Sequence, residues 1–158
     1  MIRIGHSTDI HRLENGNTLI IGGVKIPHYK GTVAHSDGDC LLHTVAESLI
    51  GSLALGDLGK LFPDTSKVYE NIDSSEIVTV VMGHIKSRGY RVVNIDSTIY
   101  LETPKLRKYI DEMRSNIALL LEIDIDLVSV KATTGEKVGI VGKEEAIVTE
   151  SVVLVTND

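Results

Sequence analysis

The chain has 158 residues, 42% of them hydrophobic, which is enough for one domain around one sizeable core. Its 16 basic and 22 acidic residues give a formal net charge of −6, which argues against nucleic-acid binding, because that function needs a basic face to neutralise phosphates. With one cysteine, no membrane-length apolar run and a charged N-terminal segment unlike a signal peptide, we expect a cytoplasmic protein without disulfides and without membrane partners.

The first third of the chain predicts a hairpin followed by a loop. Alternating apolar side chains predict strands over 2–13 and 18–26, joined around ENGN, in which Asn-Gly tolerates positive φ. The segment HYKGTVAHSDGD, residues 28–39, is predicted to be a loop.

The middle of the chain predicts two helices. Apolar residues at helical spacing indicate a helix over 40–55, with Ser36 or Asp37 as its N-cap. The long connection over 56–72 contains Gly and Pro, and its length inside a compact domain indicates a working loop. A capping-box pattern and a final glycine predict the second helix over 73–89.

The C-terminal half adds three strands and a helix. We expect a strand over 90–101, a helix that Pro104 opens and that runs to residue 123, and strands over 126–134 and 146–155. The last strand is apolar on both faces, which is typical of a central strand or of one buried against another subunit. This order predicts an α/β (α+β) single-domain sandwich over residues 1–158, with helices packed on one mixed sheet.

A possible metal site begins in GHSTDIH, residues 5–11. Asp9 and His11 lie two residues apart, so on a strand they share a face while His6 points to the other. His43 on the first predicted helix is the candidate third ligand. Three protein ligands with a fourth position open are typical of a catalytic zinc site.

Two other interpretations of His43 remain open. It could be a hydrogen-bonded histidine that lines the core, or it could bind metal with Cys40, one helical turn away. We rank the cysteine pair lower, because a lone buried cysteine is usually a small hydrophobic residue.

The sequence AHSDGD, residues 34–39, leads into the first helix and could bind phosphate at the helix start, where backbone N–H groups are free. His35 and Ser36 would add side-chain donors. Asp37 and Asp39, the latter on the face of His43, would repel phosphate unless a metal intervenes. The alternative is ordinary N-capping.

A second anion site is indicated by KATTGEK, residues 131–137, where two hydroxyls, lysines and a carboxylate follow a strand. Glu136 could hold Mg²⁺, which prefers few carboxylates together with phosphate oxygens. Lys105, at a predicted helix start, could face a base or a phosphate. The alternative is that these threonines are simply good strand residues.

Together these motifs resemble the 2-C-methyl-D-erythritol 2,4-cyclodiphosphate synthase family. The resemblance runs nearly end to end, through GH..DIH, IIGGVKIP, AHSDGD, LLH, ALGDLGKLFPDT, NIDSTI, PKL and VKATTGEKVG. AHSDGD with GDLGKLFPDT is highly specific when the Asp-x-His pair precedes them. The resemblance implies conversion of 4-diphosphocytidyl-2-C-methyl-D-erythritol 2-phosphate to the 2,4-cyclodiphosphate with release of CMP, in the non-mevalonate route of isoprenoid biosynthesis.

The resemblance also implies a homotrimer with active sites between subunits, one Zn²⁺ per subunit and a second divalent cation, Mg²⁺ or Mn²⁺. The implied zinc ligands are Asp9, His11 and His43, the second cation would bind through Glu136, and His35 and Thr134 would stabilise the transition state. The implied contacts of the erythritol and 2-phosphate portion are Asp9, Ile10, His11, His35, Ser36, Asp57, Leu58, Gly59, Phe62, Pro63, Asp64, Thr65 and Ser66. Those of the cytidine diphosphate portion and its surroundings are Leu101, Glu102, Thr103, Pro104, Lys105, Leu106, Arg107, Ala132, Thr133, Thr134, Gly135, Glu136, Ile140 and Lys143.

Two departures from the family pattern stand out. Gly135 replaces the third Thr of ATTTE, and GIVGKEEA replaces GFTGRGEG, so Ile140 and Lys143 stand for an aromatic residue and an arginine. In the family this region lines the trimer axis, where a phosphate or an isoprenoid diphosphate binds. Because Glu144 and Ala146 also differ from the family pattern, we do not expect this axial pocket in the present chain.

Two rival functions share some of these features. A zinc phosphohydrolase acting on nucleotides would use the same ligands but release inorganic phosphate. A non-catalytic binding module would explain the α/β pattern, but not a metal triad beside a phosphate-binding helix start.

Overall fold

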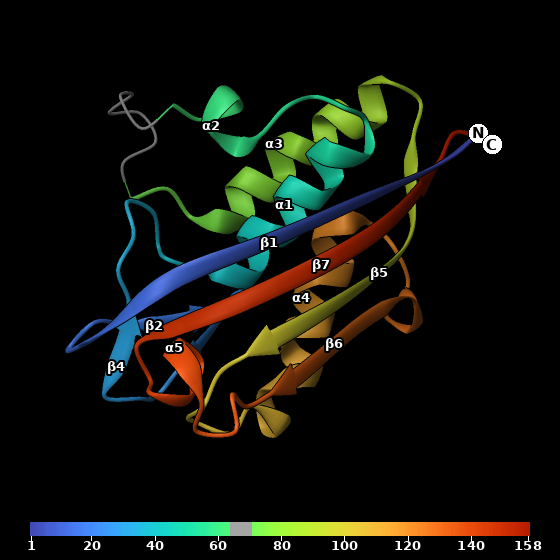
Figure 1. Ribbon diagram of the computed structural model, residues 1–158. Coiled ribbons are helices and arrows are strands. Elements are labelled where there is room, and N and C mark those ends of the chain that lie inside the picture. The colour runs from blue at the N-terminus through green and yellow to red at the C-terminus, as the bar shows by residue number, and fades with distance from the viewer. Residues whose placement is uncertain (64–70) are drawn as a thin grey trace.

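A five-stranded mixed sheet forms the framework of the computed structural model, which describes residues 1–63 and 71–158 (Figure 1). Its strand order is β4-β1-β7-β5-β6, and only β5 and β6 pair in parallel. The apolar strand β7 is central, as its pattern predicts. The strand bounds are β1 Ile2–Asn15, β4 Lys30–Thr32, β5 Arg91–Tyr100, β6 Val128–Thr133 and β7 Ala146–Thr156.

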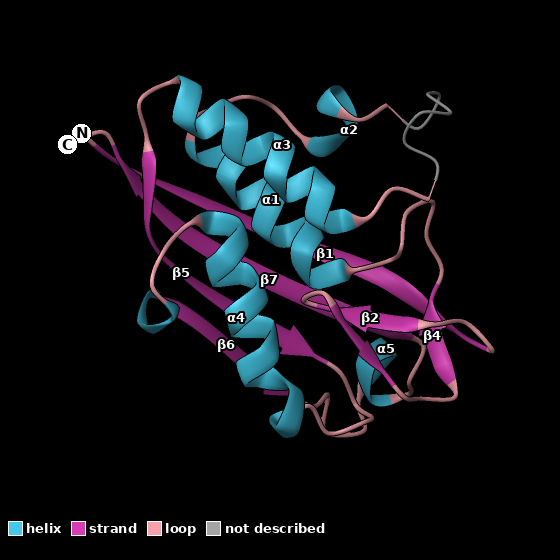
Figure 2. Cartoon of the chain, turned by 180° about the vertical axis from the view of Figure 1, so that it is seen from behind, coloured by secondary structure: helices cyan, strands magenta, loops and turns pink. Residues whose placement is uncertain are grey.

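The longer helices cover one face of this sheet and contribute to its hydrophobic core (Figure 2). The three longer ones are α1 Cys40–Ser52, α3 Ser74–Ser87 and α4 Ile110–Leu121; the short ones are α2 Leu58–Leu61, α5 Gly139–Gly142, η2 Arg107–Tyr109 and η3 Ile125–Leu127. The α+β architecture with one mixed sheet is therefore confirmed. No helix in the described ranges is both long and apolar enough to cross a bilayer.

Strand β1 presents alternate side chains to the helices. Ser7 is buried, and Asp9 and His11 are half-buried on the same face, whereas His6 is exposed on the other, as the spacing predicts. Gly5 allows α1 to pack directly on β1, because a Cβ there would collide with the carbonyl oxygen of Ser48. This close approach brings the α1 side chains next to Asp9 and His11.

The outward face of the sheet is not covered by the helices, and several of its apolar side chains are exposed. Ile2, Ile4 and Ile10 of β1 and Val152 of β7 are between 39% and 67% exposed. The two chain ends lie side by side at one end of β1 and β7, where the amino group of Met1 is 2.6 Å from the carboxylate of Asp158 (Figure 1).

The predicted hairpin between residues 2–13 and 18–26 is wrong. Residues 18–26 themselves form a hairpin, β2 Leu19–Ile21 and β3 Val24–Ile26, in a separate two-stranded sheet. Strand β1 pairs instead with β4, inside the predicted loop. The cause is distant in sequence: the carboxylate of Asp39 accepts the N–H groups of Gly22 and Gly23 at the hairpin turn, at 2.9 and 2.7 Å.

Two helix starts also differ from the prediction. The N-cap of α1 is Asp39, whose carboxylate accepts the N–H of Leu42, and neither Ser36 nor Asp37 caps this helix. Pro104 does not open a helix; it follows a cis peptide bond, and the helical segment begins at Arg107 with η2. The predicted start of α3 is confirmed, with its N-cap at residue 73.

Candidate functional site

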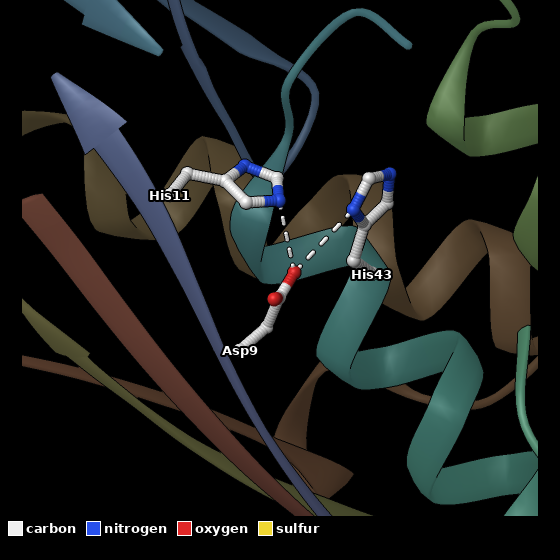
Figure 3. A group of neighbouring side chains, drawn as sticks. All are labelled: Asp9, His11 and His43. Carbon is white, nitrogen blue, oxygen red and sulfur yellow. Dashed lines mark ion pairs between the residues drawn. The ribbon is translucent and has the colours of Figure 1, made fainter. Parts of the chain in front are cut away.

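Asp9 and His11 of β1 and His43 of α1 converge on one point (Figure 3). The Oδ2 atom of Asp9 lies 3.1 Å from Nε2 of His11 and 3.4 Å from Nδ1 of His43. The three ligand atoms all lie within 4.8 Å of one another. All three side chains are partly exposed, between 12% and 26%, so the cluster is open to solvent on one side.

The remaining polar atoms of the cluster have partners that orient the three side chains. Nδ1 of His11 lies 3.1 Å from the carbonyl oxygen of Gly38, and Nε2 of His43 lies 3.1 Å from the hydroxyl of Ser36. The second carboxylate oxygen of Asp9 accepts the N–H of Ile10 at 2.8 Å. Such outer contacts are typical of metal-binding histidines, because they fix the ring and its tautomer.

The charges in the cluster reinforce one another. Burial raises the pKa of Asp9, but hydrogen bonds from His11 and His43 outweigh it and hold the pKa well below its usual range. Burial lowers the pKa of His11, and the hydrogen bond and charge of Asp9 outweigh it, so the net pKa is raised. The carboxylate is therefore ionised and ready to bind a cation.

The donor set fits a small divalent metal ion. Two imidazole nitrogens and one carboxylate oxygen are ligands that zinc accepts, and tetrahedral bonds of about 2.0–2.1 Å place neighbouring ligand atoms about 3.3 Å apart. The Asp9–His11 and Asp9–His43 distances, 3.1 and 3.4 Å, are close to this value. The alternative ligand Cys40 is excluded from the cluster: its thiol is buried, accepts from Thr149, and burial raises its pKa.

The loop that precedes α1 is held by its two aspartates, Asp37 and Asp39. Asp37 accepts the N–H and the hydroxyl of Ser74 at the start of α3. Asp39 is fully buried, and burial raises its pKa to about 6 although three backbone N–H groups oppose the shift. Because its carboxylate occupies the start of α1, the expectation that Asp39 faces the site together with His43 is wrong.

A second group of predicted residues lines a pocket of about 710 Å³ between the ends of β5 and β6 and the segment after β5. Glu102 accepts the N–H groups of Gly135 at 2.8 Å and Lys137 at 3.2 Å, which fixes the loop after β6. The hydroxyl of Thr134 lies 3.5 Å from Glu136 in this loop. The predicted residues that line the pocket are Leu101, Glu102, Pro104, Lys105, Leu106, Arg107, Ala132, Thr133 and Thr134.

The loop after α1 carries a third group of predicted residues. Asp57 caps α2, which contains Leu58 and Gly59; Phe62 follows at its C-cap, and Pro63 is the last described residue before the gap. Asp64, Thr65 and Ser66 lie outside the described residues. Glu47 of α1, which sequence reasoning missed, accepts the hydroxyl of Ser7 at 3.0 Å and the N–H of Leu58 at 3.4 Å, and so links this loop to β1.

The remaining predicted residues lie elsewhere. Ile140 lines a separate pocket of about 570 Å³ together with Ile10, Arg12 and Lys30, and Lys143 is the C-cap of α5. The Thr103 hydroxyl is hydrogen-bonded to Glu144. His35 and Ser36 lie in the loop before α1, where the Ser36 hydroxyl contacts His43. Among the described residues, the linings of these two pockets include none of the three metal candidates, so neither of these two pockets reaches the metal cluster.

Comparisons with known proteins find similar sequences and similar folds over nearly the whole chain. The model of the YgbB family matches residues 2–156. A 2-C-methyl-D-erythritol 2,4-cyclodiphosphate synthase of Actinobacillus succinogenes is 52% identical over 154 residues, 98% of each chain. The bifunctional IspDF of Campylobacter jejuni superposes with a TM-score of 0.93 at 35% identity, over 98% of this chain and 42% of that one. IspF of Plasmodium falciparum, in a CDP complex, superposes with a TM-score of 0.85 at 32% identity, over 98% of this chain and 95% of that one.

Proposed function

The chain belongs to the YgbB family, and from this premise we propose that it is a 2-C-methyl-D-erythritol 2,4-cyclodiphosphate synthase. It would convert 4-diphosphocytidyl-2-C-methyl-D-erythritol 2-phosphate to the cyclic diphosphate and CMP, in the non-mevalonate route of isoprenoid biosynthesis. One observation carries the proposal: a chain 52% identical to such a synthase places Asp9, His11 and His43 around one open point.

The proposed reaction needs no nucleophile from the protein. An oxygen of the substrate's 2-phosphate forms a bond to the β-phosphorus, and the bond from that phosphorus to the bridging oxygen breaks, so CMP leaves with the electron pair. The chain's task is to fold the substrate into in-line geometry and to neutralise charge. This matches a site built from ligands and donors rather than from an activated serine or cysteine.

The metal-binding residues would neutralise much of that charge. Asp9, His11 and His43 would hold Zn²⁺, and Glu136 would hold a second cation, Mg²⁺ or Mn²⁺. When bound, these ions supply Lewis-acid stabilisation of phosphate oxygens. A chain with a net charge of −6 has few other means of binding so anionic a substrate.

Other side chains would bind and orient the substrate. Thr134 and His35 would donate hydrogen bonds to charge that develops in the transition state. Lys105 and the backbone of 132–136 line or flank the pocket of about 710 Å³, whose position suits the cytidine diphosphate portion. The loop with Asp57 and Gly59 would contact the erythritol hydroxyls.

The separation between the metal cluster and the pocket proposed for the cytidine diphosphate portion supports an assembly of several subunits. In the described part of the chain, the residues that line the larger pocket include none of the metal candidates, and the outward sheet face exposes Ile2, Ile4, Ile10 and Val152. An exposed apolar patch on a sheet is typical of a subunit interface. We therefore include in the proposal a homotrimer whose active sites lie between neighbouring subunits.

The deciding experiment is to incubate the protein with the cytidylyl substrate, zinc and magnesium, and to follow the products by ³¹P NMR. We expect equal amounts of CMP and cyclic diphosphate, and none after treatment with a chelator. Release of inorganic phosphate would instead support a phosphohydrolase. Absence of any turnover by metal-loaded protein would reject the proposed reaction.

A further inference from the structure

The hydroxyl of Ser36 occupies an unusual position between a backbone amide and the candidate metal ligand His43. Its Oγ atom accepts the N–H of Gly38 at 3.1 Å and lies 3.1 Å from Nε2 of His43. The other ring nitrogen of His43, Nδ1, faces Asp9. Because this inference concerns the outer contacts of the proposed metal centre, it rests on the proposed function.

The position of the ring proton of His43 in a metal-bound state assigns a role to the Ser36 hydroxyl. If Nδ1 of His43 binds a metal ion, it must present a lone pair, so the ring proton resides on Nε2. Nε2 then donates to Ser36, whose Oγ uses one lone pair for Gly38 and the other for His43. Without the Ser36 hydroxyl, the Nε2–H group of His43 would have no hydrogen-bond acceptor. The His43 side chain is only 15% exposed, so losing this hydrogen bond would be costly.

The surrounding loop keeps Ser36 in place by contacts that do not involve His43. The next residue, Asp37, is bonded to the N–H and hydroxyl of Ser74 on α3. Gly38 has a φ of +75°, and a Cβ there would collide with the Thr32 hydroxyl, so the backbone can turn here only at glycine. The hydroxyl is therefore presented to His43 by a loop that is fixed independently.

The two histidines differ in this respect. Nδ1 of His11 is oriented by the carbonyl oxygen of Gly38, which no side-chain substitution removes. His43 is oriented by a side chain. We propose that Ser36 is a positioning residue of the metal centre, and that its hydroxyl holds His43 in the tautomer and ring orientation that present Nδ1 to the metal.

The test compares metal affinity in three variants, by competition between the protein and a chromophoric chelator for zinc and for cobalt. Loss of an outer-shell partner typically weakens metal binding 10- to 100-fold, and we expect this for Ser36→Ala. Ser36→Thr keeps the hydroxyl and should recover most of the affinity. Ser74→Ala removes the hydroxyl bond to Asp37 but keeps the bond from the backbone N–H of residue 74 and the Ser36 hydroxyl, so it should lower the melting temperature and leave metal affinity close to that of the wild type.

A second readout reports on the tautomer itself. In zinc-loaded protein labelled with ¹⁵N, NMR should show a hydrogen-bonded Nε2–H of His43 that disappears into fast exchange in Ser36→Ala. Unchanged affinity and an unchanged Nε2–H signal in Ser36→Ala would overturn the inference, as would equal weakening by Ser74→Ala. A wild-type protein that binds no metal would instead reject the metal centre of the proposed function.

Discussion

The carboxylate of Glu102 holds the backbone of Gly135 in place across the larger pocket: Oε2 accepts the Gly135 N–H at 2.8 Å, while Oε1 accepts that of Lys137 at 3.2 Å. Two hydrogen bonds accepted by one carboxyl group fix the loop that presents Thr134 and Glu136. Glu102 thus shapes the pocket by ordering a loop from a neighbouring strand.

Replacing Glu102 with alanine should therefore release this loop. We expect the amides of Gly135 and Lys137 to exchange with deuterium markedly faster, because both lose their acceptor, while α1 and β1 remain protected. Hydrogen exchange followed by mass spectrometry measures this directly. Glu112→Ala, at an exposed position on α4, is the control. Equal protection of residues 133–137 in both variants would show that Glu102 does not order the loop.

Thr134→Ala should mainly slow the chemical step. A donor to developing charge matters more in the transition state than in the ground state, and loss of one such donor costs about 3 kcal/mol, or about 100-fold in kcat. Steady-state kinetics should show this fall with KM nearly unchanged. Thr79→Ala, an exposed hydroxyl on α3, serves as the control. A raised KM at wild-type kcat would assign Thr134 to substrate binding alone.

The capping residues Asp39 and Asp73 should respond differently to asparagine. The Oδ1 atom of Asp39 accepts from Gly22 and Leu42 and its Oδ2 from Gly23, so either orientation of an amide places its NH₂ against at least one of these N–H groups. We expect Asp39→Asn to lose about 2–3 kcal/mol of unfolding free energy in urea. Asp73→Asn should lose less than about 0.5 kcal/mol, since Asp73 caps α3 through one N–H that an amide oxygen can accept. Similar losses in the two variants would contradict this account.

The metal-free protein should become less stable as the pH rises. The net pKa of folded His11 is raised, so its stabilisation is complete below the unfolded value of about 6.5 and is lost as pH rises through the raised pKa. With chelator present, the urea midpoint should fall as the pH rises above about 6.5, and less so in His11→Gln. Zinc needs neutral histidine, so adding it should stabilise more at the higher pH. Parallel pH curves for the two proteins would exclude a role for His11.

If each active site joins two subunits, damage to its two halves should complement. His11→Ala lacks the metal half but keeps Thr134 and Glu136, and Glu136→Ala has the opposite defect. In a mixed cyclic trimer, one boundary pairs an intact metal half with an intact nucleotide half. Refolding the two inactive variants together should restore part of the CMP release, whereas each alone stays inactive. Mixed trimers, confirmed by mass, that show no recovery would place both halves within one chain.

Local periodicity explains what the sequence could predict. The two-residue repeat places Asp9 and His11 on one face, and the helical repeat places His43 on the face of α1 that meets β1. What it could not predict depends on contacts between distant residues. Locally, Ser36 and Asp37 are N-caps as good as Asp39, but Asp37 is engaged by Ser74 on another helix.

The same limit applies to the β2–β3 hairpin and to the carboxylates that order the loops. The turn at residues 22 and 23 is stabilised by Asp39, which lies far along the chain. Glu47 and Glu102 each act on backbone N–H groups of another segment, and their sequence neighbourhoods resemble those of ordinary surface glutamates. Side chains that bond to remote backbone leave no periodic signal.

The adjacency of the two chain ends makes the topology tolerant of new connections. Asp9 lies eight residues along β1 from Met1, which at about 3.3 Å per residue is roughly 26 Å. A second domain fused to either end would therefore attach at the same place, far from the metal cluster. The Campylobacter jejuni protein, in which the matching region occupies 42% of a bifunctional chain, has such an extended architecture. A short linker between Asp158 and Met1 would equally permit circular permutation, with new ends opened in a surface loop.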